Sequence, residues 1–125
     1  MPAVETECPC LDPIRPPMAA STLTAAPVLT RFRLALGEIY GDRLERVIVY
    51  GSRARGDARA DSDYDVAVFL RDMNDLGAEL HRLARLEIAL IEATGAVVHA
   101  MPCRAGAYNE RTPLMREIRH EGIAL

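Results

Sequence analysis

The feature that most constrains the fold of this chain is a run of β-branched residues that ends in a glycine and a serine. Residues 47–50, Val-Ile-Val-Tyr, have the composition of a buried strand, and Gly51-Ser52 follows directly. Glycine lets the backbone turn tightly and approach a ligand closely because it has no Cβ. The first N–H groups of a helix that starts here would be free to bind a phosphate. We therefore predict a phosphate-binding turn at Gly51 and Ser52. Arg53 or Arg55 could offset the phosphate charge, although an exposed arginine on a turn needs no such role.

Two aspartates lead into the next apolar run of the sequence. Successive strand side chains point to opposite faces, so Asp63 and Asp65 should share one face while Val66, Val68 and Leu70 take the other. Two neighbouring carboxylates repel each other unless a cation lies between them. Mg²⁺ prefers one or two carboxylates together with phosphate oxygens and water. The sequence thus predicts a phosphate-binding turn beside an acidic pair on neighbouring strands, as nucleotidyl or phosphoryl transfer requires.

The same residues carry a family resemblance. Gly51-Ser52 followed, ten residues on, by Asp63-Tyr64-Asp65 resembles the signature of the DNA polymerase β-like nucleotidyltransferase superfamily. The string Gly-Ser-Arg-Ala-Arg-Gly through Ser-Asp-Tyr-Asp is most similar to the minimal nucleotidyltransferases, small proteins often encoded as antitoxins beside a HEPN-domain toxin. The resemblance runs from about residue 22 to the C-terminus. It implies a palm-like α/β catalytic domain that uses ATP with Mg²⁺, or with Mn²⁺, held by Asp63 and Asp65.

The sequence departs from the family pattern at one position. In the family a third acid lies in the third strand, where it completes the metal site and helps to deprotonate the attacking hydroxyl. The corresponding string here is Val98-His99-Ala100, which places His99 where the acid is expected. Neither Asp nor Glu occurs between Gly95 and Asn109, so a shift in register does not restore a carboxylate.

Three interpretations of His99 remain open from the sequence. The protein could have lost its chemistry and act as a binding module. Alternatively, two carboxylates suffice for one Mg²⁺ with ATP, and His99 is the general base, the role in which histidine is most frequent. His99 could also be a metal ligand, which would favour Mn²⁺ or Zn²⁺ because imidazole suits these metals.

The resemblance also implies an activity and a partner. The implied reaction is transfer of AMP from ATP to a hydroxyl, a tyrosine of a HEPN-type toxin, so that the chain acts as an antitoxin. The alternative is a catalytically inactive antitoxin of the same fold that neutralises its partner by binding alone. A third interpretation, less favoured because the sequence leaves no room for an acceptor-binding domain, is transfer to a small molecule such as an aminoglycoside.

Composition narrows the classes further. The chain has 125 residues, a length that suits a single domain. A net charge of −3 argues against binding of nucleic acid by bulk electrostatics. Three cysteines do not make a disulfide framework, and the odd count suits a reducing cytoplasm. The sequence contains no apolar run long enough to cross a membrane.

Periodicity predicts an α/β fold in which helices cover a small mixed sheet. We expect a disordered, proline-rich leader over residues 1–20 and the nucleotidyltransferase domain over 21–125. Helices are expected from a Ser21 or Thr22 cap to about residue 40, near 53, from 72–74 to 93 and from 112 to 122, with strands at 46–50, 64–70 and 96–101. The predicted core stripes comprise Leu29, Phe32, Leu36 and Ile39, then Leu76, Leu80, Leu83, Leu86 and Leu90. Ile88 and Ile91 widen the second stripe, which suggests either a buried helix or a partner surface.

Overall fold

A computed structural model describes residue 23 and residues 26–125. The expected leader and the expected cap at Ser21 or Thr22 lie outside these residues. The elements in chain order are α2 (Pro27–Tyr40), η1 (Gly41–Arg43), β1 (Leu44–Tyr50), α3 (Ser52–Arg55), β2 (Tyr64–Leu70), α4 (Leu76–Thr94), β3 (Val98–Arg104), η2 (Ala105–Asn109), α5 (Pro113–Glu121) and β4 (Ile123–Ala124). The predicted order of helices and strands is confirmed, with the short 3-10 helices η1 and η2 and the strand β4 in addition.

The strands form one mixed sheet in the order β3-β2-β1-β4. β1 runs antiparallel to both β2 and β4, and β2 runs parallel to β3. Tyr50 is paired with Asp65 across β1 and β2, and Asp65 is paired with His99 across β2 and β3. The end of β1 therefore meets the beginnings of β2 and β3 at one edge of the sheet. The expected mixed α/β fold is confirmed.

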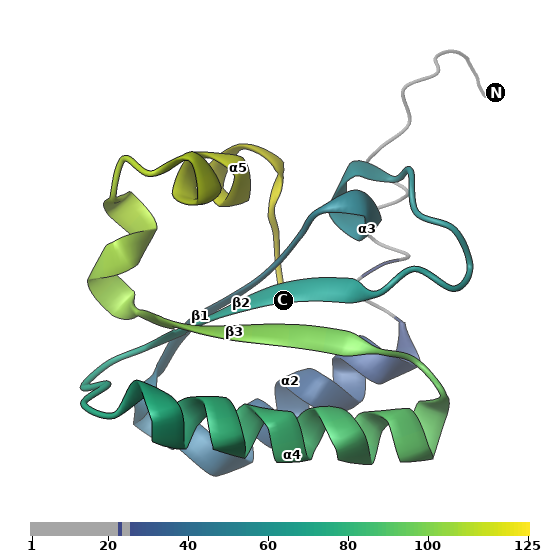
Figure 1. Cartoon of the computed structure of the whole chain (residues 1–125), viewed down its shortest axis with the longest axis horizontal. Coiled ribbons are helices and arrows are strands. Elements are labelled where there is room, and N and C mark those ends of the chain that lie inside the picture. Colours follow the sequence, from purple (N-terminus) through teal and green to yellow (C-terminus); the bar gives the residue numbers. More distant parts are fainter. Residues whose placement is uncertain (1–22, 24–25) are drawn as a thin grey trace, which may run out of the picture.

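Helices cover both faces of the sheet, with α2 and α4 on one face and α3 and α5 on the other (Figure 1). Val66, Val68 and Leu70 of β2 belong to the core under α2 and α4. The intervening residues Ala67 and Phe69 belong to the second core, under α5. This alternation confirms the predicted assignment of β2 side chains to the two faces. Because Asp65 is two residues before Ala67, it lies on the α3 and α5 face.

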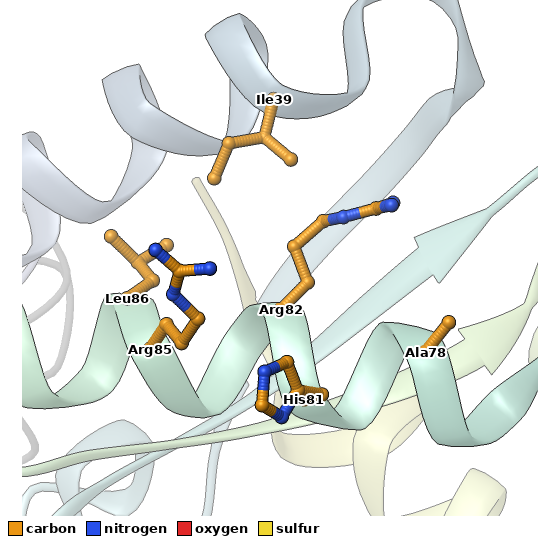
Figure 2. A pocket seen from close by; sticks show the side chains of 6 residues that line it. All are labelled: Ile39, Ala78, His81, Arg82, Arg85 and Leu86. Carbon is orange, nitrogen blue, oxygen red and sulfur yellow. The ribbon is translucent and has the colours of Figure 1, made fainter.

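Helix α2 begins later than predicted, but it ends at Tyr40 as predicted. It begins at Pro27, a residue that is favoured in the first turn because that turn leaves its N–H groups unpaired anyway. At the other end, the prediction that Ile39 is core was wrong, since Ile39 is 41% exposed and Tyr40 is buried instead. Ile39 lines a groove of about 600 Å³ between α2 and α4, facing Arg82 (Figure 2). The buried face of α2 is therefore rotated slightly from the predicted one, so that Tyr40 takes the place in the core that was predicted for Ile39.

Helix α4 is capped by Asp75, whose carboxylate accepts the Ala78 N–H at 3.1 Å. Leu83 and Leu90 are buried, as predicted. The prediction that Leu76 and Leu80 are core was wrong, because both are about half exposed. The helix packs against β3 and against α2, and its buried stripe runs through Glu79, Leu83 and Leu90. Leu76 and Leu80 lie to one side of this stripe. Two further residues, Ile88 and Ile91, are exposed as well (57% and 42%).

Within the described residues, none of the helices has the length and apolar character needed to span a membrane.

Strand β3 covers Val98–Arg104, whereas the sequence predicted 96–101. The predicted end at Met101 was three residues too early, because the strand continues through Pro102. β3 is an edge strand, where the missing N–H of proline costs no ladder bond if it faces outward. Glu87 of α4 accepts the Ala100 N–H at 2.7 Å, so this helix fastens the edge strand by a side chain. After η2, Thr112 caps α5 by accepting the Met115 N–H at 3.2 Å, as predicted.

A buried carboxylate joins α4 to η1 at the edge of the sheet where β1 begins and β2 ends. Glu79 of α4 accepts hydrogen bonds from Arg43 of η1 at 2.7 Å and from Arg82 at 3.0 Å. Burial alone would raise the pKa of Glu79, but the hydrogen bond and charge of Arg43, with the charge of Arg82, hold that pKa below its ordinary value. The neighbouring Tyr40 hydroxyl is also buried, and burial together with Glu79 raises the pKa of Tyr40 to about 12.

We expect Glu79→Gln to lower the free energy of unfolding by about 1–3 kcal/mol at neutral pH, because it removes hydrogen bonds to a charged group. A carboxyl with a lowered pKa stabilises the fold above its unfolded-state pKa and loses that contribution as pH falls through its folded-state pKa. The difference between wild type and Glu79→Gln should therefore shrink as pH falls below about 4.5, the ordinary value. Urea unfolding from pH 7 to pH 3 measures it.

The matched control is Glu45→Gln, which breaks the more exposed pair of Glu45 with Arg71 (3.0 Å). Surface pairs contribute little, so this variant should lose less than about 1 kcal/mol. Equal losses in the two variants, or a Glu79→Gln effect independent of pH, would contradict the role given to Glu79.

Candidate active site

Gly51 connects β1 to α3 with a backbone that other residues rarely adopt. Its φ is 76° and its ψ is −155°, a combination essentially restricted to glycine. A Cβ at this position would lie 2.7 Å from Oδ2 of Asp65, closer than side chains tolerate. The glycine is therefore required twice, once for the turn and once for the close approach of an acidic side chain. This contact brings the predicted turn and the predicted acid Asp65 together.

Asp65 faces a tyrosine that the sequence analysis did not single out. Tyr50, its cross-strand partner, is half-buried against the core under α5. Burial, followed by the negative charge of Asp65 and smaller electrostatic contributions from Cys103 and Glu117, raises the pKa of Tyr50. The signal in the sequence was the position of Tyr50, directly before the Gly-Ser turn; Glu117 of α5 gave no signal because it is distant in sequence.

Asp63 and His99 form a pair at the mouth of the site. Oδ2 of Asp63 lies 2.8 Å from Nε2 of His99. Their side chains are partly exposed, 44% for Asp63 and 61% for His99. His99 is at the same time the parallel neighbour of Asp65 in the sheet. All three residues named as catalytic candidates therefore lie at one edge, with His99 beside both aspartates.

The two arginines named as phosphate-binding candidates contact other parts of the protein. Arg53 donates to the carbonyl groups of Ser62 and Ala60, while Arg55 donates to Asp57 at 3.2 Å and to Glu121 at 3.4 Å. Arg55 thus ties α3 to the loop and to α5, and its charge is shared with two carboxylates. These contacts direct both guanidinium groups at protein carbonyl and carboxylate groups, and they do not by themselves place either group over the Gly51 turn.

The donor set at this edge fits a hard divalent cation. Asp63 and Asp65 offer two carboxylates, and Mg²⁺ accepts one or two of these with phosphate oxygens and waters. Across residue 23 and residues 26–125, no group of three or more His, Cys, Asp or Glu side chains is arranged to hold a metal ion. The remaining ligands would thus have to come from the substrate and from water. Nε2 of His99 is directed at the Asp63 carboxylate. This contact favours a hydrogen-bonding role for His99 over a role as a third metal ligand.

Comparison with known proteins identifies the class. Residues 29–119, most of the chain, match the family described as nucleotidyltransferase domain, and the chain belongs to this family. A segment of 49 residues is 39% identical to a provisionally named protein adenylyltransferase from Methanocaldococcus jannaschii. That segment covers 39% of this chain and 50% of the relative, so the match spans about half of the relative's length.

Solved structures share the fold. A provisionally named nucleotidyltransferase from Sulfolobus solfataricus superposes with a TM-score of 0.59 at 17% identity, over 85% of each chain. A toxin-antitoxin structure with AMP-PNP gives 0.54 at 21% identity, over 75% of this chain and 69% of the other. A mutant of the toxin-antitoxin MntA-HpeT gives 0.53 at 19% identity over the same shares. At these identities the likeness concerns the fold.

We expect Gly51→Ala to abolish magnesium-dependent ATP binding, because the added Cβ would displace the Asp65 carboxylate. It should also cost about 1–3 kcal/mol of stability from the strained backbone. Isothermal titration calorimetry with a non-hydrolysable ATP analogue and Mg²⁺, run beside thermal unfolding, measures both effects.

The control is Gly56→Ala at the other end of α3. Gly56 also has a positive φ, 85°, but a Cβ there meets nothing within 4 Å. This variant should be strained yet keep its affinity for the analogue. If both variants bind the analogue like wild type, the close contact of Gly51 with Asp65 does not matter for the site.

Proposed function

We propose that this chain is a protein adenylyltransferase that transfers AMP from ATP to a hydroxyl of a partner protein. The observation that carries the proposal is the convergence of Asp63, Asp65 and His99 beside the Gly51 turn. The family supports nucleotidyl transfer, and the partial match to a provisionally named protein adenylyltransferase supports a protein acceptor. Gly51 and Ser52 are proposed to bind the β- and γ-phosphates, and Asp63 and Asp65 to hold Mg²⁺, or Mn²⁺.

The proposed reaction balances as a single displacement. The acceptor oxygen forms a bond to the α-phosphorus of ATP, the bond from that phosphorus to the bridging oxygen of the β-phosphate breaks, and pyrophosphate leaves. A bound divalent cation supplies charge neutralisation for the triphosphate. What the chain contributes is alignment: Asp65 is fixed against Gly51, and Asp63 is fixed by His99.

His99 is proposed to receive the proton of the acceptor hydroxyl. In this proposal Asp63 is ionised and therefore only accepts, so that Nε2 of His99, 2.8 Å away, carries the ring proton. The other ring nitrogen, Nδ1, then carries the lone pair that takes a proton. A carboxylate that orients a histidine and fixes its tautomer is a recurring arrangement in general-base catalysis. In this proposal His99, oriented by Asp63, takes the place of the family's third acid.

The partner is proposed to be a HEPN-type toxin whose tyrosine is the acceptor, so that the chain acts as an antitoxin. Support comes from the likeness in fold to two toxin-antitoxin structures, one of them with AMP-PNP. Leu80, Ile88 and Ile91 on α4 provide exposed apolar area for a protein contact.

A second candidate is an antitoxin that acts by binding alone. The observation in its favour is that the described residues contain no group of three metal-binding side chains. The two candidates differ in one measurable property: only the first moves AMP to the partner.

We expect label from α-labelled ATP to appear on the toxin with wild type and Mg²⁺, and to be lost in Asp63→Asn and Asp65→Asn. His99→Ala should slow transfer about 10²–10⁴-fold, the usual contribution of a positioned base. His99→Asp restores a third carboxylate and should keep transfer with Mg²⁺. Absence of wild-type transfer, with binding of the toxin intact, would favour the binding-only candidate. Transfer unaffected by His99→Ala would exclude the proposed base.

We expect Ile88→Lys to weaken association with the toxin at least tenfold while leaving the unfolding midpoint within about 2 °C, because surface substitutions rarely change stability by more than about 0.5 kcal/mol. The control, Ala89→Lys, places the same charge on another exposed side of α4. Surface plasmon resonance with the catalytically inactive Asp65→Asn background separates association from transfer. Equal affinities for the two lysine variants would move the contact elsewhere.

A further inference from the structure

Arg53 holds the chain on both sides of Asp63. Its Nη2 donates to the Ser62 carbonyl at 2.8 Å and to the Ala60 carbonyl at 3.1 Å, and its Nε lies 3.3 Å from the same Ser62 oxygen. Its guanidinium carbon lies 4.2 Å from the centre of the Tyr64 ring. Ser62 and Tyr64 are the two neighbours of Asp63 in the sequence, so one side chain grips both.

The loop that Arg53 contacts, residues 59–62, is itself held by hydrogen bonds between Arg59 and Ser62. The Arg59 N–H donates to Oγ of Ser62 at 2.8 Å, and the Ser62 N–H donates to the Arg59 carbonyl at 3.1 Å. The Tyr64 N–H then donates to the Val97 carbonyl at 2.9 Å. Arg53 is the connection between this turn and α3, which itself starts at the Gly51 turn.

We propose that Arg53 is a positioning residue for Asp63 and does not act as a phosphate ligand. A planar guanidinium with donors in a fixed fork can bind two carbonyls and stack on a ring at once, which an ammonium cannot do. Because α3 begins at Gly51, Arg53 couples the position of the Asp63 carboxylate to the turn that holds Asp65. Side chains that orient metal ligands in this way typically change metal affinity about 10–100-fold when replaced. The inference rests on the proposed metal role of Asp63.

The two roles predict opposite results for a lysine. If Arg53 offsets phosphate charge, Arg53→Lys keeps the charge and most of the function, and any loss appears with ATP. If Arg53 positions Asp63, Arg53→Lys and Arg53→Gln both weaken Mn²⁺ binding without nucleotide, by about tenfold or more. Mn²⁺ binding to the full chain is measured by electron paramagnetic resonance. The matched control is Arg46→Lys, which removes another arginine stacked on a tyrosine, Tyr108, at 3.8 Å.

Hydrogen exchange of the backbone amides gives a readout that needs neither metal nor activity. Arg53→Lys should speed exchange at residues 59–63, while exchange in β1 and β3 reports that the fold is intact. Faster exchange together with weaker Mn²⁺ binding supports the proposal. Unchanged exchange, or faster exchange with unchanged Mn²⁺ affinity, overturns it.

Two outcomes separate this inference from the proposed function. Should wild type bind Mn²⁺ neither alone nor with a non-hydrolysable ATP analogue, the proposed metal role fails and this inference is overturned with it, whatever the exchange shows. If wild type transfers AMP and binds Mn²⁺ but Arg53→Lys behaves like wild type, the function stands and the positioning role is overturned.

Discussion

The contact between Gly51 and the Asp65 carboxylate is the constraint on which the rest of the structure depends. The space for a Cβ at Gly51 is taken by Asp65 Oδ2, so β1 has to end at a glycine where β2 begins. The pairing of Tyr50 with Asp65 then sets the register of the two central strands. A slip of one residue would turn Asp65 away and expose Val66 and Val68, which the core under α2 and α4 buries. The same register therefore serves the core and the site.

Carboxylates at the two ends of the sheet have opposite environments: one is buried and paired with arginines, and the others are partly exposed. Where β2 ends, the buried Glu79 is matched by Arg43 and Arg82, so a carboxylate there is neutralised inside the fold. Where β2 begins, Asp63 contacts His99, and the Arg53 guanidinium donates its hydrogen bonds to the backbone carbonyls of Ser62 and Ala60. The acidic pair is thus partly exposed, and among the described residues it has no ion pair with an arginine. Such an arrangement suits a site that receives a cation together with its substrate.

Local sequence signals predicted the element order, the mixed sheet, the faces of β2 and the shared face of Asp63 and Asp65, whereas the position of His99 beside them was implied by the family resemblance. The locally predicted features depend on strand alternation, glycine and capping residues, all of which are local. The exposure of Leu76 and Leu80 could not be predicted in this way, because the buried side of α4 depends on packing against both α2 and β3. Likewise the end of β3 depends on its position at the sheet edge, and the grip of Arg53 on Ser62 depends on a loop folding back by nine residues.

The central claim is that Asp63 and Asp65 hold a divalent cation that the triphosphate of ATP shares at the Gly51 turn. A crystal structure with Mn²⁺ and a non-hydrolysable ATP analogue tests this claim most directly, since anomalous scattering locates the manganese. The account predicts an anomalous peak in contact with both carboxylates and with phosphate oxygens, next to the Gly51 backbone. An analogue bound away from Gly51, or manganese that contacts neither aspartate, would contradict it.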